Sequence, residues 1–144
     1  MLRILIADDH AVVRKGVMEI LMKSDASISI DEAGNGEEAL ARILRSDYEL
    51  VLLDITMPGQ SGLEVLKEIK RCLPRLPVLM LSVHREEEYV LRALRAGASG
   101  YVIKDDAAKE LIVAVWKVLG GGCYVSASLA GKLGSETDVD SSFL

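Results

Sequence analysis

The chain has 144 residues, of which 50% are hydrophobic and 27% are charged; this length and balance are typical of one folded domain and exclude a disordered chain. The net charge of -5 gives no support to binding of nucleic acid or of an anionic membrane surface through overall charge. No run of about 18 apolar residues is long enough to cross a bilayer, and the first residues leave no room for a signal peptide, so we expect a cytoplasmic protein without a membrane span.

Short apolar runs alternate with segments of helical periodicity. Runs bounded by polar or turn residues predict buried strands at residues 2–7, 28–33, 50–54, 78–82 and 99–103. Between and after them, apolar residues recur at helical spacing over about 10–23, 37–46, 61–72, 84–96 and 105–119. The alternation predicts an α/β fold: a doubly wound five-stranded parallel sheet with helices on both faces and the flavodoxin-like strand order 2-1-3-4-5.

Three positions predict where helices begin or end. Asn35 followed by Glu38, and Ser61 followed by Glu64, have the spacing of a capping box, in which a side chain satisfies a free amide of the first turn. Gly97 suits the end of the fourth helix, because glycine adopts the backbone conformation that stops a helix.

The sequence changes character after the glycines at 120–122, which end the last helix. We expect residues 1–122 to form one domain and residues 123–144 to form a linker and tail. Residues 124–133 suit a short turn or helix. Residues 134–144 are rich in Ser and Asp and lack a periodic apolar face, so we expect them to be disordered.

Polar side chains stand where the predicted strands end. Asp8 and Asp9 follow the first strand, and Asp54 ends the third. Ser82 ends the fourth strand, and Lys104 follows the fifth. In a doubly wound sheet the carboxyl ends of the strands meet at one edge, where ligands bind at the point at which the strand order reverses. One polar residue at a strand end is ordinary, but this combination favours a functional site.

Three carboxylates cannot lie together without a compensating positive charge. Oxygen ligands without imidazole or thiolate favour Mg2+, which typically keeps several waters and accepts a phosphate oxygen. One carboxylate then remains available as a nucleophile, since carboxylates attack phosphorus to give aspartyl phosphates. Ser82 and Lys104 would present a hydroxyl and an ammonium to the transferred group.

These residues, in this order and spacing, resemble the receiver domain of two-component response regulators. The resemblance covers about residues 2–119 and rests on Asp8-Asp9, on Asp54 followed by Met57-Pro58-Gly59, on Ser82, and on the segment 97–104. The segments 4–10 and 100–105 look most like the subclass that carries a C-terminal helix-turn-helix of the LuxR type. The resemblance implies reversible phosphorylation of an aspartate.

The resemblance assigns the chemistry position by position. Asp54 matches the phosphoryl acceptor. Asp9, Asp54 and the backbone carbonyl of Thr56 match the Mg2+ ligands, and Asp8 matches a residue that binds the ion mainly through water. Lys104 matches the lysine that contacts the phosphoryl group. A domain of this kind catalyses its own phosphorylation and dephosphorylation and is not expected to turn over external substrates.

The resemblance also implies a switch. Ser82 matches a catalytic hydroxyl that moves toward the phosphoryl group, and Tyr101 matches an aromatic residue that turns inward behind it. Thr56 and His84 stand at positions that tune the lifetime of the phosphoryl group in this family. Asp105 departs from the family pattern, because many receivers have a proline there, often after a cis bond; with aspartate a trans bond is expected.

The implied partners are a sensor histidine kinase and, in this subclass, a second copy of the chain. The face of helix 4, strand 5 and helix 5 is the usual output surface of the family, and helices 1 and 5 can form the dimer in this subclass; the sequence leaves both surfaces open. DNA binding by this chain itself is not expected, since no basic recognition helix follows the receiver; a missing C-terminal domain would bind DNA.

Two alternatives stay open. One is an interaction module that works without phosphorylation. The other is a phosphatase of the haloacid dehalogenase type, although Thr56 stands where that family needs a second aspartate.

Overall fold

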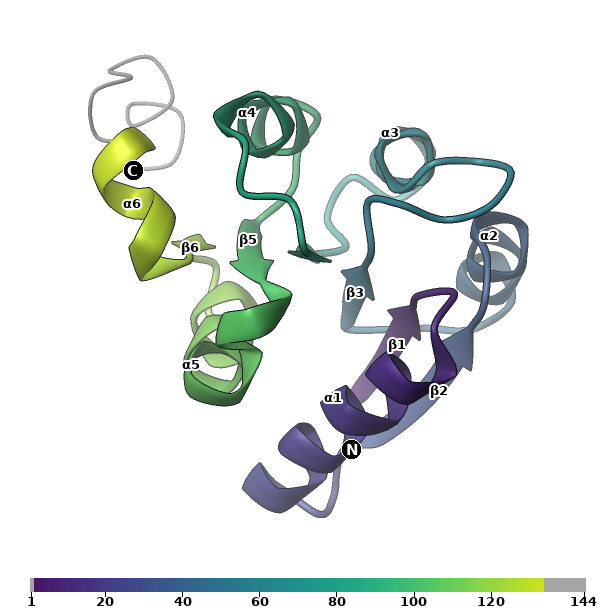
Figure 1. Ribbon diagram of the computed structural model, residues 1–144. Helices are drawn as coiled ribbons and strands as arrows, with labels where there is room; N and C mark the ends of the chain where they lie inside the picture. Colours follow the sequence, from purple (N-terminus) through teal and green to yellow (C-terminus); the bar gives the residue numbers. More distant parts are fainter. Residues whose placement is uncertain (1, 134–144) are drawn as a thin grey trace.

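The computed structural model describes residues 2–133 and shows a parallel sheet between two layers of helices (Figure 1). The strands are β1 (Arg3–Ala7), β2 (Ser29–Ala33), β3 (Leu50–Leu53), β4 (Val78–Ser82), β5 (Gly100–Ile103) and β6 (Tyr124–Val125). The helices are α1 (Ala11–Ser24), α2 (Gly36–Arg45), α3 (Gly62–Cys72), α4 (Glu87–Arg95), α5 (Ala107–Leu119) and α6 (Ala127–Leu133), with a 3-10 turn, η1 (Lys104–Asp106), before α5. The expected tail at 134–144 lies outside the described residues.

The sheet has the strand order β2-β1-β3-β4-β5-β6. The predicted α/β class, parallel pairing and relative order of the first five strands are confirmed, but the prediction of five strands is wrong. The sixth, Tyr124–Val125, pairs in parallel with Gly100 and Tyr101 of β5. Two residues are too few to show a strand periodicity in a sequence.

The helices cover both faces of the sheet. Figure 1 shows α2, α3 and α4 on one face and α1 and α5 on the other. One apolar cluster includes Leu53, Val65 and Tyr101, and the second includes Leu52, Val17 and Leu111. All four residues of β3 are buried, because adjacent residues of a central strand face opposite helix layers. None of the helices between residues 2 and 133 combines the length and apolar character that crossing a bilayer requires.

Both predicted capping residues act as expected. The side chain of Asn35 accepts a hydrogen bond from the Glu38 amide at 2.8 Å, and Ser61 Oγ accepts one from the Glu64 amide at 3.3 Å. Gly97 has a φ of 105° and follows the last turn of α4, as predicted.

Helix α4 begins at Glu87, three residues later than predicted. The intervening backbone makes other contacts: the His84 amide donates to Ser82 Oγ at 3.0 Å, and the His84 carbonyl accepts from the Tyr101 hydroxyl at 2.8 Å. The peptide bonds between the described residues are all trans, including the one before Asp105.

Candidate functional site

The ends of β1 and β3 bring two carboxylates together below the surface. Ala7 and Leu53 are register partners, so the next residues, Asp8 and Asp54, leave the sheet side by side. The Asp54 amide donates to the Ala7 carbonyl at 2.9 Å, which continues the hydrogen-bond ladder between β1 and β3 up to Asp54. Asp8 is 2% exposed and Asp54 is 3% exposed. Buried carboxylates of this kind require a charge partner.

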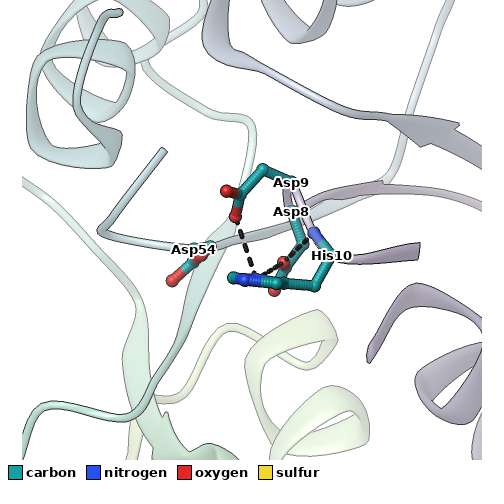
Figure 2. A group of neighbouring side chains, drawn as sticks. All are labelled: Asp8, Asp9, His10 and Asp54. Carbon is teal, nitrogen blue, oxygen red and sulfur yellow. Dashed lines mark hydrogen bonds and ion pairs between the residues drawn. The ribbon is translucent and has the colours of Figure 1, made fainter. Parts of the chain in front are cut away.

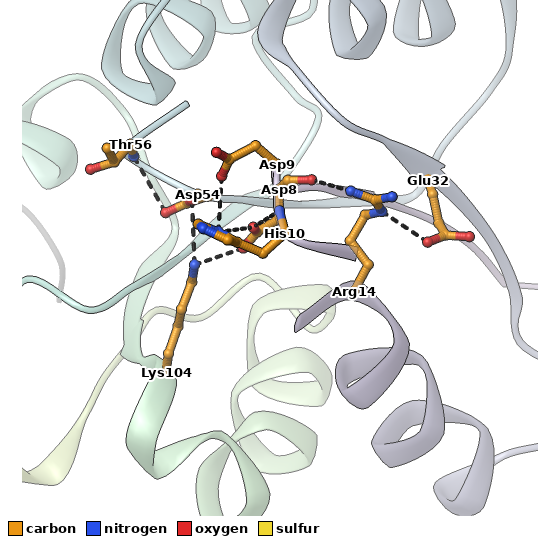
Figure 3. Close-up of polar contacts among 8 residues, drawn as sticks. All are labelled: Asp8, Asp9, His10, Arg14, Glu32, Asp54, Thr56 and Lys104. Atoms are coloured by element: carbon orange, nitrogen blue, oxygen red, sulfur yellow. Dashed lines mark hydrogen bonds and ion pairs between the residues drawn. The ribbon is translucent and has the colours of Figure 1, made fainter. Parts of the chain in front are cut away.

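Lys104 is that partner. Its Nζ lies 2.7 Å from Asp8 Oδ2 and 3.4 Å from Asp54 Oδ2, and Figure 3 shows it reaching both from the first turn after β5. The lysine side chain is 12% exposed, so water screens these interactions less than at an open surface. One ammonium thus bridges Asp8 and Asp54, two of the carboxylates that the sequence predicted would converge.

Burial raises the pKa of the Asp54 carboxyl above its ordinary value, and the negative charge of Asp8 raises it further. Lys104 acts in the opposite direction. The ionised form of Asp54 is therefore costly in this pocket, and additional positive charge would favour it.

Asp8 and Asp54, with the two residues that follow Asp8, form a candidate cation site. Ligand atoms of Asp8, Asp9, His10 and Asp54 lie within 4.8 Å of one another. Figure 2 shows the four side chains as one group. Three carboxylates and the ammonium of Lys104 leave two negative charges unbalanced, which one divalent cation would neutralise. The carboxylate oxygens suit Mg2+. The residues present therefore fit the ion that the sequence predicted.

His10 was not singled out from the sequence as part of this site. Its Nδ1 lies 3.0 Å from Asp9 Oδ1 and 3.3 Å from Asp8 Oδ1. The His10 side chain is 67% exposed, and imidazole is a poor ligand for Mg2+. We therefore assign the cation site to the oxygen ligands and regard His10 as a neighbour at its rim.

Gly62, the first residue of α3, lets the helix begin directly against the backbone of Asp54 and Ile55. A Cβ atom at Gly62 would lie 1.9 Å from the backbone carbonyl oxygen of Asp54, and the Gly62 amide donates to the Ile55 carbonyl at 2.7 Å. Any larger residue would push the helix away from the loop that carries Asp54. The only sequence signal was a glycine just after a capping serine.

The predicted switch residues are buried in the paired strands β4 and β5. Ser82 and Tyr101 are both 0% exposed, and the tyrosine hydroxyl donates to the His84 carbonyl, which places its ring inward. Burial raises the pKa of Tyr101 to about 12, so its hydroxyl remains a donor at neutral pH.

Thr56 and His84 contact each other next to Asp54. Thr56 Oγ1 lies 2.8 Å from His84 Nε2, and the His84 ring stacks on Tyr89 with centroids 4.3 Å apart. The Thr56 amide donates to Asp54 Oδ1 at 3.3 Å. Two loops far apart in sequence thus touch beside the Asp54 carboxylate.

Comparison with known families gives one match that covers most of the chain. Residues 4–116 match the sequence model of the response regulator receiver domain. Among curated relatives, the oxygen regulatory protein NreC of Staphylococcus carnosus is 36% identical over 94% of this chain and 63% of its own length. The transcriptional activator protein ExaE of Pseudomonas putida is 39% identical over 90% of this chain and 61% of its own. The chain therefore spans about three fifths of the length of these relatives.

Solved structures share the fold. A two-component response regulator of the LuxR family from Aurantimonas sp. SI85-9A1 is 30% identical, with a TM-score of 0.87 over 94% of this chain and 96% of that one. The response regulator protein TrrA from Thermotoga maritima, in complex with Mg(2+)-BeF, is 37% identical, with a TM-score of 0.74 over 82% of this chain and 99% of that one.

Proposed function

Since the chain belongs to the family of response regulator receiver domains, we propose that it accepts a phosphoryl group on Asp54 from the phosphohistidine of a sensor histidine kinase. A carboxylate oxygen of Asp54 attacks phosphorus, the new O–P bond forms, and the P–N bond of the donor breaks as the histidine nitrogen leaves. The observation that carries this proposal is the buried bridge from the Lys104 ammonium to both Asp8 and Asp54.

The proposal gives each neighbour a task. Lys104 neutralises charge on the transferred group, and the Ser82 hydroxyl donates to one of its oxygens. A Mg2+ ion held by Asp9, Asp54 and the Thr56 carbonyl, with Asp8 acting mainly through water, would supply further positive charge to the phosphoryl oxygens. Hydrolysis of the aspartyl phosphate then returns the domain to its starting state.

The phosphoryl group would add about two negative charges at Asp54. Such a change can shift a conformational equilibrium only if the two states bind the group differently. We propose that Ser82 and Tyr101 provide this difference, because both are buried and both contact the His84 backbone. The readout would be an output or dimerisation surface.

In the full-length protein we propose that this switch regulates transcription through a C-terminal DNA-binding domain, with the receiver itself not contacting DNA. The names of the relatives support this, since one is a transcriptional activator and one a regulatory protein. A cytoplasmic location and self-association between two copies belong to the same proposal.

The test is incubation with phosphoramidate and Mg2+, followed by intact-protein mass spectrometry. We expect the wild-type chain to gain the mass of one phosphoryl unit and Asp54→Asn to gain none. Removal of the metal with EDTA should abolish the gain, since the acidic pocket then lacks its cation. Asp47→Asn is the matched control, because Asp47 is exposed and precedes β3 rather than following it.

A wild-type chain that gains no mass would favour an interaction module independent of phosphorylation. A gain that persists in Asp54→Asn would assign the acceptor to another residue and refute the proposal. Circular dichroism of each variant shows whether the chain remains folded.

A further inference from the structure

Arg14, on the first turns of α1, makes contacts that the proposed chemistry has not used. Its Nη1 donates to the backbone carbonyl of Asp8 at 2.6 Å, and its Nε pairs with Glu32 Oε1 at 2.9 Å. Figure 3 shows the Arg14 guanidinium between the turn that carries the acidic pair, Asp8 and Asp9, and Glu32 of β2. The arginine side chain is 18% exposed and that of Glu32 is 43% exposed, so the contacts are partly buried and lie at the edge of the site.

The position of the Asp8 carbonyl affects the geometry of the site. It belongs to the same planar peptide group as the Asp9 amide, so holding the carbonyl fixes the direction in which the chain enters Asp9. The other polar groups of Asp8 have different partners: its amide donates to the Ala33 carbonyl at 3.0 Å, and its Oδ2 lies 2.7 Å from the Lys104 ammonium. Asp8 Oδ1 accepts from the His10 amide at 2.8 Å, which also restrains this turn. Arg14 adds a side-chain contact to the Asp8 carbonyl and so restrains the rotation of the peptide between the two aspartates.

Arginine suits this role better than lysine. A guanidinium offers several N–H donors in one rigid plane and can serve two acceptors at fixed angles. Here one donor serves the turn and another serves Glu32, and the ion pair holds the plane in place. Glu32 also balances the arginine charge, so the effect of Arg14 on the pocket is mainly geometric.

We infer that Arg14 is a positioning residue for the acidic pair: through the peptide that joins Asp8 and Asp9 it keeps both carboxylates turned toward the cation site beside Asp54. This inference rests on the proposed function, because it presumes that the pair holds Mg2+. Glu32 supports Arg14 from β2 and acts only through it.

The test measures Mg2+ binding to the unphosphorylated chain by isothermal titration calorimetry. We expect Arg14→Met to weaken binding about 10-fold or more, the scale on which residues that orient metal ligands act. Lys15→Met is the matched control, because it removes the same charge from the next, exposed position of α1. It should leave the affinity within about twofold, since charges at an open surface are well screened.

A second readout separates positioning from a loss of folded protein. The rate of phosphorylation by phosphoramidate is followed as Mg2+ is raised. For Arg14→Met we expect the half-saturating Mg2+ concentration to rise with little change in the maximal rate. A merely structural role would lower the maximal rate and leave the half-saturating concentration where it was.

Glu32→Gln provides an independent variant if Arg14→Met does not fold. It keeps the arginine but removes the ion pair that holds its plane, and we expect Mg2+ binding to weaken several-fold. The inference is overturned if Arg14→Met binds Mg2+ with wild-type affinity. If only Glu32→Gln folds, wild-type Mg2+ affinity in that variant overturns it. Failure of the wild-type chain to bind Mg2+ or accept a phosphoryl group would instead overturn the proposed function.

Discussion

The acidic pocket at the ends of β1 and β3 and the edge formed by β6 and α6 differ in how their buried polar groups are paired. In the pocket, Asp8 and Asp54 repel each other and share one ammonium. At the edge, Ser126 is 0% exposed, yet its amide donates to the Tyr101 carbonyl and its Oγ accepts from the Ile103 amide, both at 2.9 Å. The comparison shows where electrostatic repulsion remains: Asp8 and Asp54 share one positive charge, whereas the amide and the hydroxyl of Ser126 each have a hydrogen-bond partner.

The edge is also apolar where it meets the domain. Leu129 of α6 is 2% exposed and joins the cluster formed on the α4 side of the sheet. A Cβ at Gly100 would lie 2.3 Å from the Tyr124 carbonyl oxygen, so β6 approaches β5 as closely as a bare backbone allows. These contacts stabilise the fold without contributing a group to the site.

The largest effect should come from removing the shared ammonium. Lys104→Met keeps much of the side-chain length but leaves Asp8, Asp54 and the transferred group without their positive neighbour. Because such preorganised charges typically contribute 100-fold or more to a rate, we expect phosphorylation by phosphoramidate at saturating Mg2+ to slow by about 100-fold. The rate is measured by intact-protein mass spectrometry over time.

Lys109→Met is the control, since this lysine is exposed on α5 and its loss should leave the rate nearly unchanged. Equal rates for Lys104→Met and the wild-type chain would show that the ammonium only maintains the fold.

The next effect concerns the edge. Leu129→Ala removes a buried side chain from the apolar cluster, and we expect the free energy of unfolding to fall by about 2 kcal/mol or more. Urea denaturation followed by circular dichroism measures this change. The same substitution at Leu44, which is 68% exposed, should change the stability by less than about 0.5 kcal/mol.

Stability and phosphorylation should respond independently to this substitution. Folded Leu129→Ala protein should accept a phosphoryl group as fast as the wild-type chain, because Leu129 adds nothing to the pocket. Unchanged stability in Leu129→Ala would contradict the packing of α6 against the sheet.

The pocket was more predictable from the sequence than the edge. Asp8, Asp54 and Lys104 each directly follow or end a strong apolar run, and the rule for parallel strands brings such positions to one edge of a sheet. The capping residues Asn35 and Ser61 were equally predictable, since their signals lie within four residues of each other.

The remaining features depend on contacts between distant segments. β6 is too short for a periodic pattern, and its one indirect signal was Gly100, a glycine within a predicted strand, which often marks a close backbone neighbour. The contacts of Arg14 with Glu32 of β2 and with the Asp8 carbonyl join segments that are separate in sequence, so no local pattern around Arg14 predicts them. The late start of α4 likewise reflects contacts of the His84 backbone with Ser82 and Tyr101.

The smallest expected effect is on the free energy of unfolding, through the ionisation of Asp54. The pKa of Asp54 is raised in the folded protein, mainly by burial and then by Asp8, so the folded state holds this proton more tightly than the unfolded chain. The stability linked to that proton is present below the ordinary aspartate pKa and is lost as the pH rises through the raised folded value. Ionised Asp54 therefore destabilises the metal-free protein at neutral pH.

Asp54→Asn should reverse this penalty. We expect its free energy of unfolding at pH 7 without metal to exceed that of the wild-type chain, by less than the loss at Leu129, because Lys104 already offsets part of the repulsion. The gain should shrink toward acidic pH, where Asp54 is protonated, and Mg2+ should stabilise the wild-type chain more than the variant, since ligand binding to the folded state adds to stability. Urea denaturation across this pH range, with Asp47→Asn as the exposed control, measures both trends. A variant less stable than the wild-type chain at neutral pH would show that Asp54 is satisfied in its pocket, and the contrast between the two regions would then disappear.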